Sequence, residues 1–448
     1  MKKFLFATMA ALLIAVMAVT LVACGEKTVN PDDPKTDVSA YKAEGYEKSQ
    51  LKNQVSWEGI NSFKSTREIA ELYKTDPDAA IKEARQIAID FFTYAKTATW
   101  IPADTWNFTH HDNGDNPDTM TGGQVYGGLP YVGLASSAIY RLMDFIDPET
   151  GVVNIYAAGG KEHELQKMFG NQCANGAYVG WSRFINSADY GGTPSMTLVN
   201  KFIPVGPYSY RADTQKWTKE YNTVQVCTDS GDQVMFQSYA KLIPGDGVIN
   251  FTSAGHVMMV VSDPVVVYKE GTDEIDGDQS YLFITDQHVN FSTYQHEDGD
   301  TCQTANYIER KFTFAQLASE KAGYIPFTYK EWLGEDPIDT PEYTCSHTGE
   351  TITIDQIYKT KFTSNYHIYD IYASIYNADG VEVAKIGTHS NGASEYKLQF
   401  ARVGITSVLW GDLNKLEPEN YEYTVKIYLQ SGTGERPTLW EGKLAAGE

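Results

Sequence analysis

A cysteine in the middle of the chain stands where it could act as a nucleophile. Cys173 follows the turn Gly170-Asn171-Gln172, and apolar residues recur after it at helical spacing as far as Phe184. A thiol in the first turn of a helix faces the positive end of the helix dipole, which lowers its pKa and favours the thiolate. Gly176 and Gly180 lower helix propensity, so we expect this helix to pack closely against another element. For Cys173 alone, a buried and unreactive cysteine is the simpler interpretation.

A histidine and an aspartate lie in two later segments that have the patterns of strands. Pro244-Gly245-Asp246 predicts a turn, followed by one strand and then by a second strand that opens with His256. The next strand, Tyr281 to His288, is apolar until Asp286. Because side chains alternate along a strand, Asp286 and Gln287 are expected on opposite faces. An imidazole at the rim of a sheet can act as a general base, and an acid one strand away can orient it. For each residue alone, an edge histidine or a solvated strand end is the simpler interpretation.

The elements that must position these residues begin with a helix. Asp76 is a capping acid and Pro77 a first-turn proline, and apolar residues follow at helical spacing. The sequence therefore predicts a helix from Pro77 to Lys96. We expect residues 41–98 to form a helical segment that packs on a domain made of residues 99–340.

The last hundred residues have a different pattern, that of short strands. Strands are predicted at residues 365–376, 381–386, 421–429 and 438–444, with Asn377 to Gly380 as a turn. Strands at this spacing favour an all-β sandwich of immunoglobulin-like type over residues 351–448. The acidic, proline-bearing stretch from Pro337 to Cys345 is typical of a linker.

Taken together, the three central segments resemble those of a known family. Gly-Asn-Gln-Cys at residues 170–173, followed by Trp181 and Arg183, is similar to the nucleophile segment of CHAP domains. Pro-Gly-Asp at 244–246, followed by Gly-His-Val, resembles the base segment shared by CHAP and NlpC-type peptidases. Residues 284–288 look like the strand on which CHAP domains place an acid before a glutamine. The resemblance covers about residues 122–290.

This resemblance implies an α+β chain with a papain-like cysteine hydrolase domain, in which the helix bearing the cysteine packs on an antiparallel sheet. Cys173 would attack a carbonyl carbon, His256 would act as base and then as acid, and Asp286 would orient the imidazole. The backbone N–H of Cys173 would contribute to an oxyanion hole. Gln287 and His288 are substitutes for Asp286 if the strand register differs.

Further candidates for the oxyanion hole come from the same resemblance. One is Gln172, directly before the nucleophile. NlpC-type enzymes also use a tyrosine in a Tyr-x-x-Gly-Gly stretch, and the run from Tyr126 to Tyr131 is similar in composition. That run lies further upstream of Cys173 than the family usually has it, so both tyrosines stay candidates.

The expected activity is hydrolysis of an amide bond, with cell-wall peptide as the substrate that the resemblance favours and with no cofactor. A transglutaminase-like acyltransferase or protease is one alternative, and a surface-binding protein with a degenerate papain-like domain is another. All three candidate catalytic residues precede Asn290. We therefore expect a chain ending near Asp339 to keep the activity.

The N-terminus predicts export and a membrane anchor. Lys2 and Lys3 precede an apolar run that ends in Leu21-Val22-Ala23-Cys24, which predicts a signal peptide over residues 1–23. The ending resembles the bacterial lipobox, which implies cleavage before Cys24, lipid on that residue and an extracytoplasmic, membrane-anchored protein. Residues 24–40 are polar and predict a tether. A membrane-spanning helix and a plain secretory signal are the alternatives.

Charge and cysteine content limit the partners. The formal net charge of −22 argues against nucleic acid and against docking on an anionic surface. Lipid on Cys24 would leave four cysteines, Cys173, Cys227, Cys302 and Cys345, which allow three disulfide pairings in an exported protein. The sequence contains no C-x-x-C and no zinc-finger spacing, so we expect no metal.

Overall fold

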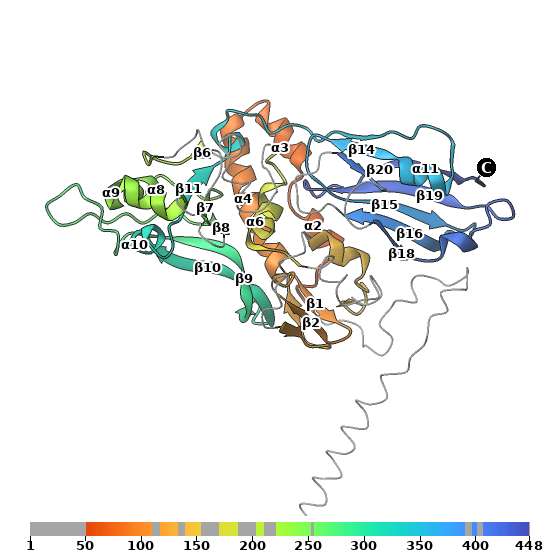
Figure 1. Cartoon of the computed structure of the whole chain (residues 1–448), viewed down its shortest axis with the longest axis horizontal. Coiled ribbons are helices and arrows are strands. Elements are labelled where there is room, and N and C mark those ends of the chain that lie inside the picture. Colours follow the sequence, from red (N-terminus) through yellow and green to blue (C-terminus); the bar gives the residue numbers. More distant parts are fainter. Residues whose placement is uncertain are drawn as a thin grey trace, which may run out of the picture.

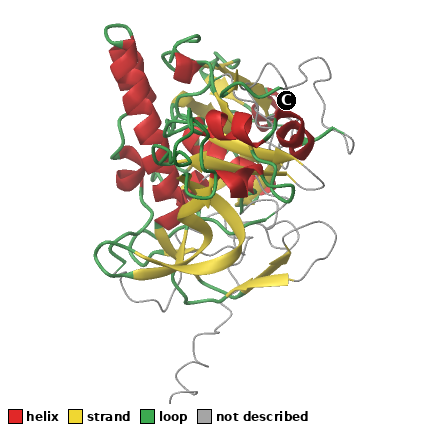
Figure 2. Ribbon diagram, turned by 90° about the vertical axis from the view of Figure 1, so that its left-hand side faces the viewer, coloured by secondary structure: helices red, strands yellow, loops and turns green. Residues whose placement is uncertain are grey.

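The computed structural model describes residues 51–109, 117–132, 139–153, 170–186, 203–209, 221–251, 255–389, 397–400 and 406–447. The expected signal peptide, the lipid-bearing Cys24 and the tether lie outside these residues. Within them the chain is a mixed α+β protein with several sheets, as the sequence predicted (Figures 1 and 2). Within these residues, none of the helices has both the length and the apolar character needed to cross a membrane.

Three helices open the described chain, and the longest is the one that the sequence predicted. They are α2 (Trp57–Asn61), α3 (Thr66–Tyr73) and α4 (Pro77–Thr97). The side chain of Asp76 caps α4 by accepting a hydrogen bond from the backbone N–H of Ala79, and Pro77 occupies the first turn. The prediction is confirmed to within one residue at the C-terminal end.

Helix α6 (Cys173–Trp181) packs between α4 and the strands that carry the other candidate residues. Its two glycines allow this close approach. A Cβ atom added at Gly180 would lie 2.5 Å from the carbonyl oxygen of Ala88 in α4, and one at Gly176 would lie 2.6 Å from Oε1 of Gln287. The expectation that this helix packs tightly is therefore confirmed.

A nine-stranded sheet supports α4 and α6. Its order is β5-β1-β4-β10-β9-β8-β7-β11-β6. The strands are β1 (Thr99–Pro102), β4 (Tyr126–Gly127), β5 (Val152–Val153), β6 (Ile203–Pro204), β7 (Gly247–Phe251), β8 (Gly255–Val260), β9 (Tyr281–Gln295), β10 (Thr301–Thr313) and β11 (Ile325–Thr328). The central strands β10, β9, β8 and β7 are antiparallel, and β7 and β8 form the expected hairpin, which pairs Asn250 with His256.

Short elements complete this half of the molecule. A two-stranded sheet pairs β2 (Trp106–Thr109) with β3 (Pro117–Met120). Figure 1 shows the small helices gathered at the end of the molecule away from the C-terminal sheets. They are α8 (Thr223–Ser230), α9 (Asp232–Tyr239) and α10 (Phe314–Ala318). Two 3-10 turns, η2 (Ile139–Asp144) and η3 (Glu331–Leu333), lie elsewhere in the chain.

The C-terminal part consists of two sheets and little helix. The larger sheet has the order β13-β20-β19-β15-β16-β18 and the smaller one β12-β14-β17. Their strands are β12 (Tyr343–Cys345), β13 (Thr351–Ile352), β14 (Lys361–Ser364), β15 (Ile368–Tyr376), β16 (Glu382–His389), β17 (Lys397–Gln399), β18 (Thr406–Trp410), β19 (Thr424–Ser431) and β20 (Thr438–Leu444), with α11 (Ile354–Lys359) and η4 (Leu413–Lys415) between them. The four strands that the sequence predicted are present within a few residues. The expected linker is corrected at its end, because Tyr343–Cys345 forms β12 and pairs with β14.

Strand β15 is buried on both faces and joins the two halves of the molecule. Ile371, Ala373 and Ile375 belong to the core of the C-terminal sheets. Tyr372, on the opposite face, packs in a second core together with Trp100 of β1. A boundary between residues 340 and 351 therefore does not separate two independent cores.

Buried ion pairs reinforce this interface. Asp144, at the end of η2, accepts hydrogen bonds at Oδ1 from Lys385 (2.9 Å) and Arg436 (2.6 Å), both in the C-terminal half. Arg141 donates to Oδ1 of Asp370 at 2.7 Å, and both side chains are fully buried. Removing one partner from such a pair leaves an uncompensated buried charge, which is strongly destabilising.

Candidate active site

Cys173 is the first residue of α6, and its side chain is buried. Its Sγ atom lies 3.7 Å from the carbonyl oxygen of Gly255, the residue directly before His256. Cys173 is a free thiol, as are the other three described cysteines, Cys227, Cys302 and Cys345. The helix start thus places an unmodified thiol beside the strand that bears the histidine.

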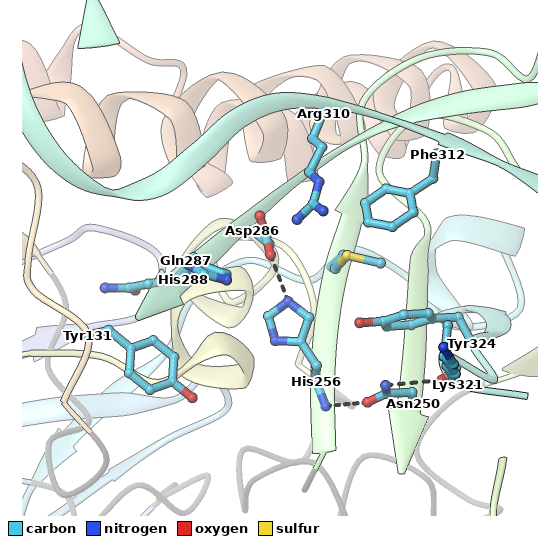
Figure 3. A pocket seen from close by; sticks show the side chains of 12 residues that line it. Tyr131, Asn250, His256, Asp286, Gln287, His288, Arg310, Phe312, Lys321 and Tyr324 are labelled. Carbon is cyan, nitrogen blue, oxygen red and sulfur yellow. Dashed lines mark hydrogen bonds and ion pairs between the residues drawn. The ribbon is translucent and has the colours of Figure 1, made fainter. Parts of the chain in front are cut away.

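His256 lies between the thiol and an acid. Its Nε2 atom is 2.6 Å from Oδ2 of Asp286, on the neighbouring strand β9 (Figure 3). The thiol of Cys173 lies close enough to the same imidazole for each group to shift the pKa of the other. Because Nε2 contacts the carboxylate, Nδ1 is the nitrogen left to face the sulfur. The structure therefore brings Cys173, His256 and Asp286 together, with the imidazole between the thiol and the carboxylate.

The backbone of His256 is held as firmly as its ring. Its N–H donates to Oδ1 of Asn250 at 2.7 Å, across the β7–β8 hairpin. The Asn250 amide in turn donates to the carbonyl oxygen of Ala322 at 3.1 Å. Asn250 was not singled out in the sequence, because an asparagine near a turn is ordinary.

The electrostatics of the cluster favour an ion pair between thiolate and imidazolium. Burial alone would raise the pKa of the Cys173 thiol. The positive charge and hydrogen bond of His256, with the backbone N–H groups of Val257 and Ala174, outweigh burial and lower that pKa below its ordinary value. Burial likewise opposes charging of His256, but Cys173 and Asp286 overcome it and raise the pKa of the imidazole.

A buried lysine lies behind the aspartate. Nζ of Lys96, at the end of α4, donates to Oγ1 of Thr285 and lies 3.6 Å from the centre of the Phe92 ring. Burial lowers the pKa of Lys96 to about 7, while the negative charge of Asp286 acts against that shift. The sequence did not reveal this residue as a neighbour of the site, because Lys96 reads as an ordinary basic residue in the last turn of a helix.

Of the two candidate tyrosines, the structure places Tyr131 at the nucleophile. The Tyr131 hydroxyl contacts both the thiol and the backbone N–H of Cys173, and burial followed by the charge of Cys173 raises the pKa of this hydroxyl. The phenol therefore stays protonated and able to donate a hydrogen bond.

The placement of Tyr126 at the oxyanion hole is corrected. Its hydroxyl accepts a hydrogen bond from the backbone N–H of Thr121 and donates to Gln124, and its ring packs against Trp100 and Phe291. Tyr126 is part of the core beside the site. The similarity in composition could not distinguish it from Tyr131.

The remaining candidates surround the cluster without replacing its members. Gln172 is the N-cap residue of α6, but its side chain does not cap the helix. Gln287 is buried and donates to the carbonyl oxygens of Leu129 and Pro130 at 2.9 and 3.2 Å. It therefore holds the segment that carries Tyr131. Register does not require a substitute for Asp286.

His288 lies at the edge of the site. Its ring centre is 4.9 Å from that of Tyr307, and its Nδ1 accepts a hydrogen bond from the backbone N–H of Asn290. It lines the cavity described next.

A cavity of about 410 Å³ opens beside His256 (Figure 3). Its walls include several residues that the sequence did not single out: Met258, Arg310, Phe312, Lys321 and Tyr324. Arg310 and Phe312 come from β10, and Lys321 and Tyr324 come from the loop after α10. Strand β10 reaches the site by pairing with β9, which no local sequence motif reveals. The described residues contain no group of three or more histidine, cysteine or acidic side chains suited to hold a metal ion.

Comparison with protein-family models, with curated proteins and with solved structures finds no match for this chain. The geometry of the site is therefore the basis of the function proposed below.

Proposed function

We propose that this chain is a cysteine hydrolase that cleaves an amide bond. The observation that carries the proposal is the cluster of Cys173, His256 and Asp286 at the edge of a cavity, where the imidazole is bonded to the carboxylate and interacts with the thiol. A buried acid that holds one imidazole nitrogen, with the other nitrogen at a thiol on a helix N-terminus, is the arrangement that nucleophilic catalysis requires.

The reaction would proceed in two steps. The Cys173 thiolate attacks the amide carbon, the C–N bond breaks, and the His256 imidazolium gives its proton to the departing amine. Water then attacks the thioester while His256 takes a proton from that water, and the thiolate leaves as the acid is released. Asp286 would keep the imidazole in the orientation and tautomer that both steps need.

The negative oxygen that forms in each step would need donors. The Cys173 backbone N–H and the Tyr131 hydroxyl meet at the nucleophile and would supply two hydrogen bonds. Gln287 would contribute indirectly, because it binds the carbonyl groups of residues 129 and 130 and so positions Tyr131.

The finer fold and setting are part of the same proposal. The packing of α6 on β8 and β9 supports a papain-like domain of the CHAP or NlpC type, and the two facing C-terminal sheets support an immunoglobulin-like sandwich. The predicted lipid on Cys24 would anchor the enzyme outside the cytoplasm, and a cell-wall peptide is the substrate that this setting favours.

Thiol reactivity tests the proposal without a known substrate. At pH 7, iodoacetamide should modify Cys173 much faster than Cys345, although Cys345 is the more exposed of the two. Burial raises the pKa of the Cys345 thiol, which leaves little of it as thiolate. Peptide mapping by mass spectrometry gives both rates.

Activity provides the second measurement. Release of new amino groups from purified cell-wall peptides should be abolished by Cys173→Ala and by His256→Ala, and reduced less by Asp286→Asn. A Cys173 that reacts no faster than Cys345 would favour a binding protein with a degenerate site. Transfer to an added amine in preference to water would favour the transglutaminase-like alternative.

A further inference from the structure

Two basic side chains line the cavity next to His256, in a protein whose formal net charge is −22. Arg310 comes from β10, where it pairs with Ile284 of β9. Lys321 comes from the loop after α10. Figure 3 shows the two side chains entering the cavity from different sides, with the His256 imidazole between them and Tyr131.

Among the described residues, no carboxylate forms an ion pair with either base. The ion pairs formed within the described chain include neither Arg310 nor Lys321. Among the described residues that line the cavity, Asp286 is the one acid, and its Oδ2 is already bound to His256. Two cations facing a cavity without their own anions provide binding capacity for a negative group.

The structure restrains the side chain of Arg310 and anchors the loop that carries Lys321. The Arg310 guanidinium lies 4.7 Å from the ring centres of both Tyr307 and Phe312, which restricts its freedom by stacking. The loop of Lys321 is fastened to the catalytic hairpin, because Asn250 donates to the carbonyl oxygen of Ala322. Ordered donors lose less entropy on binding a ligand than mobile ones do.

Arg310 and Lys321 change the net charge of the site from negative to positive. With the thiolate and imidazolium formed, Cys173, His256 and Asp286 carry one net negative charge, which would repel an acidic ligand. Arg310 and Lys321 reverse the sign locally and leave the cavity with one net positive charge. Phe312, Tyr324 and Met258 add apolar wall, which suits an aliphatic stem that ends in a charged group.

We propose that this cavity binds a carboxylate of the substrate through Arg310 and Lys321, so that the amide cleaved at Cys173 belongs to an acidic peptide. This deepens the proposed hydrolase function and rests on it. The carboxylate would sit on a residue next to the scissile amide, because the cavity wall includes His256 itself.

Binding tests the proposal without requiring catalysis. Two C-terminally amidated peptides, acetyl-Ala-Glu-NH2 and acetyl-Ala-Gln-NH2, would be titrated into the full chain carrying Cys173→Ala, with chemical shifts or heat as the readout. The glutamate peptide should bind at least about tenfold more tightly than its amide analogue, as expected for charge-assisted bonds to a guanidinium. Arg310→Gln should remove most of that preference.

A neighbour on the same strand provides the matched control. Lys311 follows Arg310, but its ammonium lies over the Tyr281 ring, and it does not line the cavity. Lys311→Gln removes the same unit of charge and should preserve the preference for the glutamate peptide. Equal binding of the two peptides, or equal losses in both variants, would overturn the proposal.

A second experiment separates this proposal from that of the hydrolase. Iodoacetate is an anion and iodoacetamide is neutral, so the ratio of their rates at Cys173 reports the charge of the cavity. Arg310→Gln should lower the ratio severalfold, whereas Lys311→Gln should preserve it. If Cys173 reacts with neither reagent, the proposed hydrolase activity is refuted. The peptide titration still decides whether the cavity binds a carboxylate. If Arg310→Gln changes the pH profile of the iodoacetamide reaction and not the ratio, Arg310 serves Asp286 and the carboxylate proposal fails.

Discussion

Trp181, in the last turn of the helix that begins with Cys173, donates its indole N–H to the carbonyl oxygen of Gly245 at 2.8 Å. Gly245 lies in the turn before β7, and the β7–β8 hairpin carries His256. One hydrogen bond thus ties the helix of the nucleophile to the hairpin of the base. Trp332 donates to the same oxygen at 3.1 Å.

We expect Trp181→Phe to reduce reactivity more than stability. The carbonyl oxygen of Gly245 keeps its bond from Trp332, so the free energy of unfolding should fall by only about 1–2 kcal/mol for the lost bond and altered packing. The thiol and imidazole would be less well aligned, and the iodoacetamide rate at Cys173 should drop severalfold. Trp332→Phe is the matched control, since it removes a bond to the same oxygen but leaves α6 tied to the turn. Equal reactivity of the two variants would show that this tie does not align the site.

The ion pair predicts an unusual pH profile for Cys173. A lowered pKa means that the thiolate persists below about pH 8.5, where an ordinary thiol becomes protonated, and is lost only as pH falls through the lowered pKa. The iodoacetamide rate should therefore fall less steeply from pH 9 to pH 7 than the rate of an ordinary thiol, and it should decline further in acid. His256→Ala removes the imidazolium, so the pKa of the thiol should rise and the rate at pH 6 should fall at least about tenfold. A profile that His256→Ala leaves unmoved would mean that the two residues are not coupled.

Lys96 makes stability depend on pH in the alkaline range. Its pKa is about 7 in the folded chain and about 10.4 when unfolded, so the unfolded chain binds one more proton between these values. The free energy of unfolding should therefore rise with pH there, by up to about 1.4 kcal/mol per pH unit. Lys96→Met should be more stable than the unchanged protein at pH 7.5 and should lose this rise.

Urea unfolding at pH 7.5 and pH 9.5 measures the difference. Lys82→Met, on the exposed side of the same helix, should keep the rise. If Lys96→Met is instead less stable at pH 7.5 and keeps the pH dependence, the ammonium is charged and structurally required.

Local motifs explain how much of the site could be predicted. Cys173 and His256 each stand at the start of an element that the surrounding glycines, prolines and apolar residues mark out, and Asp286 ends an apolar run. Such signals depend on near neighbours in the chain. Arg310 reaches the cavity only through the pairing of β10 with β9, and that pairing contains a register shift between Tyr307 and Arg310. The alternation of residues along one strand does not predict such a shift in pairing.

The interface between the halves was missed for a related physical reason. The run from residue 365 to 376 predicts a strand, and its scarcity of exposed polar positions fits burial on both faces. The pattern does not say what covers the second face. Tyr372 packs there with residues far away in the sequence, and the partners of Asp144 lie more than 200 residues further along the chain.

Asp144 is where the two halves depend on each other most directly. Asp144→Asn would leave Lys385 and Arg436 facing a neutral group in a buried interface, and we expect the free energy of unfolding to fall by about 3–5 kcal/mol. Burial raises the pKa of Asp144, but Arg436 and Lys385 outweigh it and lower that pKa well below its usual range. The stabilisation is therefore present above the ordinary carboxyl pKa of about 4, and it is lost as pH falls through the lowered value in the folded chain.

Glu441→Gln breaks the exposed pair with Lys426 and should cost less than about 1 kcal/mol, which makes it the matched control. Chemical unfolding of the full chain at pH 7 gives the loss of stability for each of the two variants. A large loss for Asp144→Asn, accompanied by a slower reaction of Cys173, would show that the C-terminal sheets support the site, against the expectation that a chain ending near Asp339 keeps its activity. Equal, small losses in the two variants would restore that expectation.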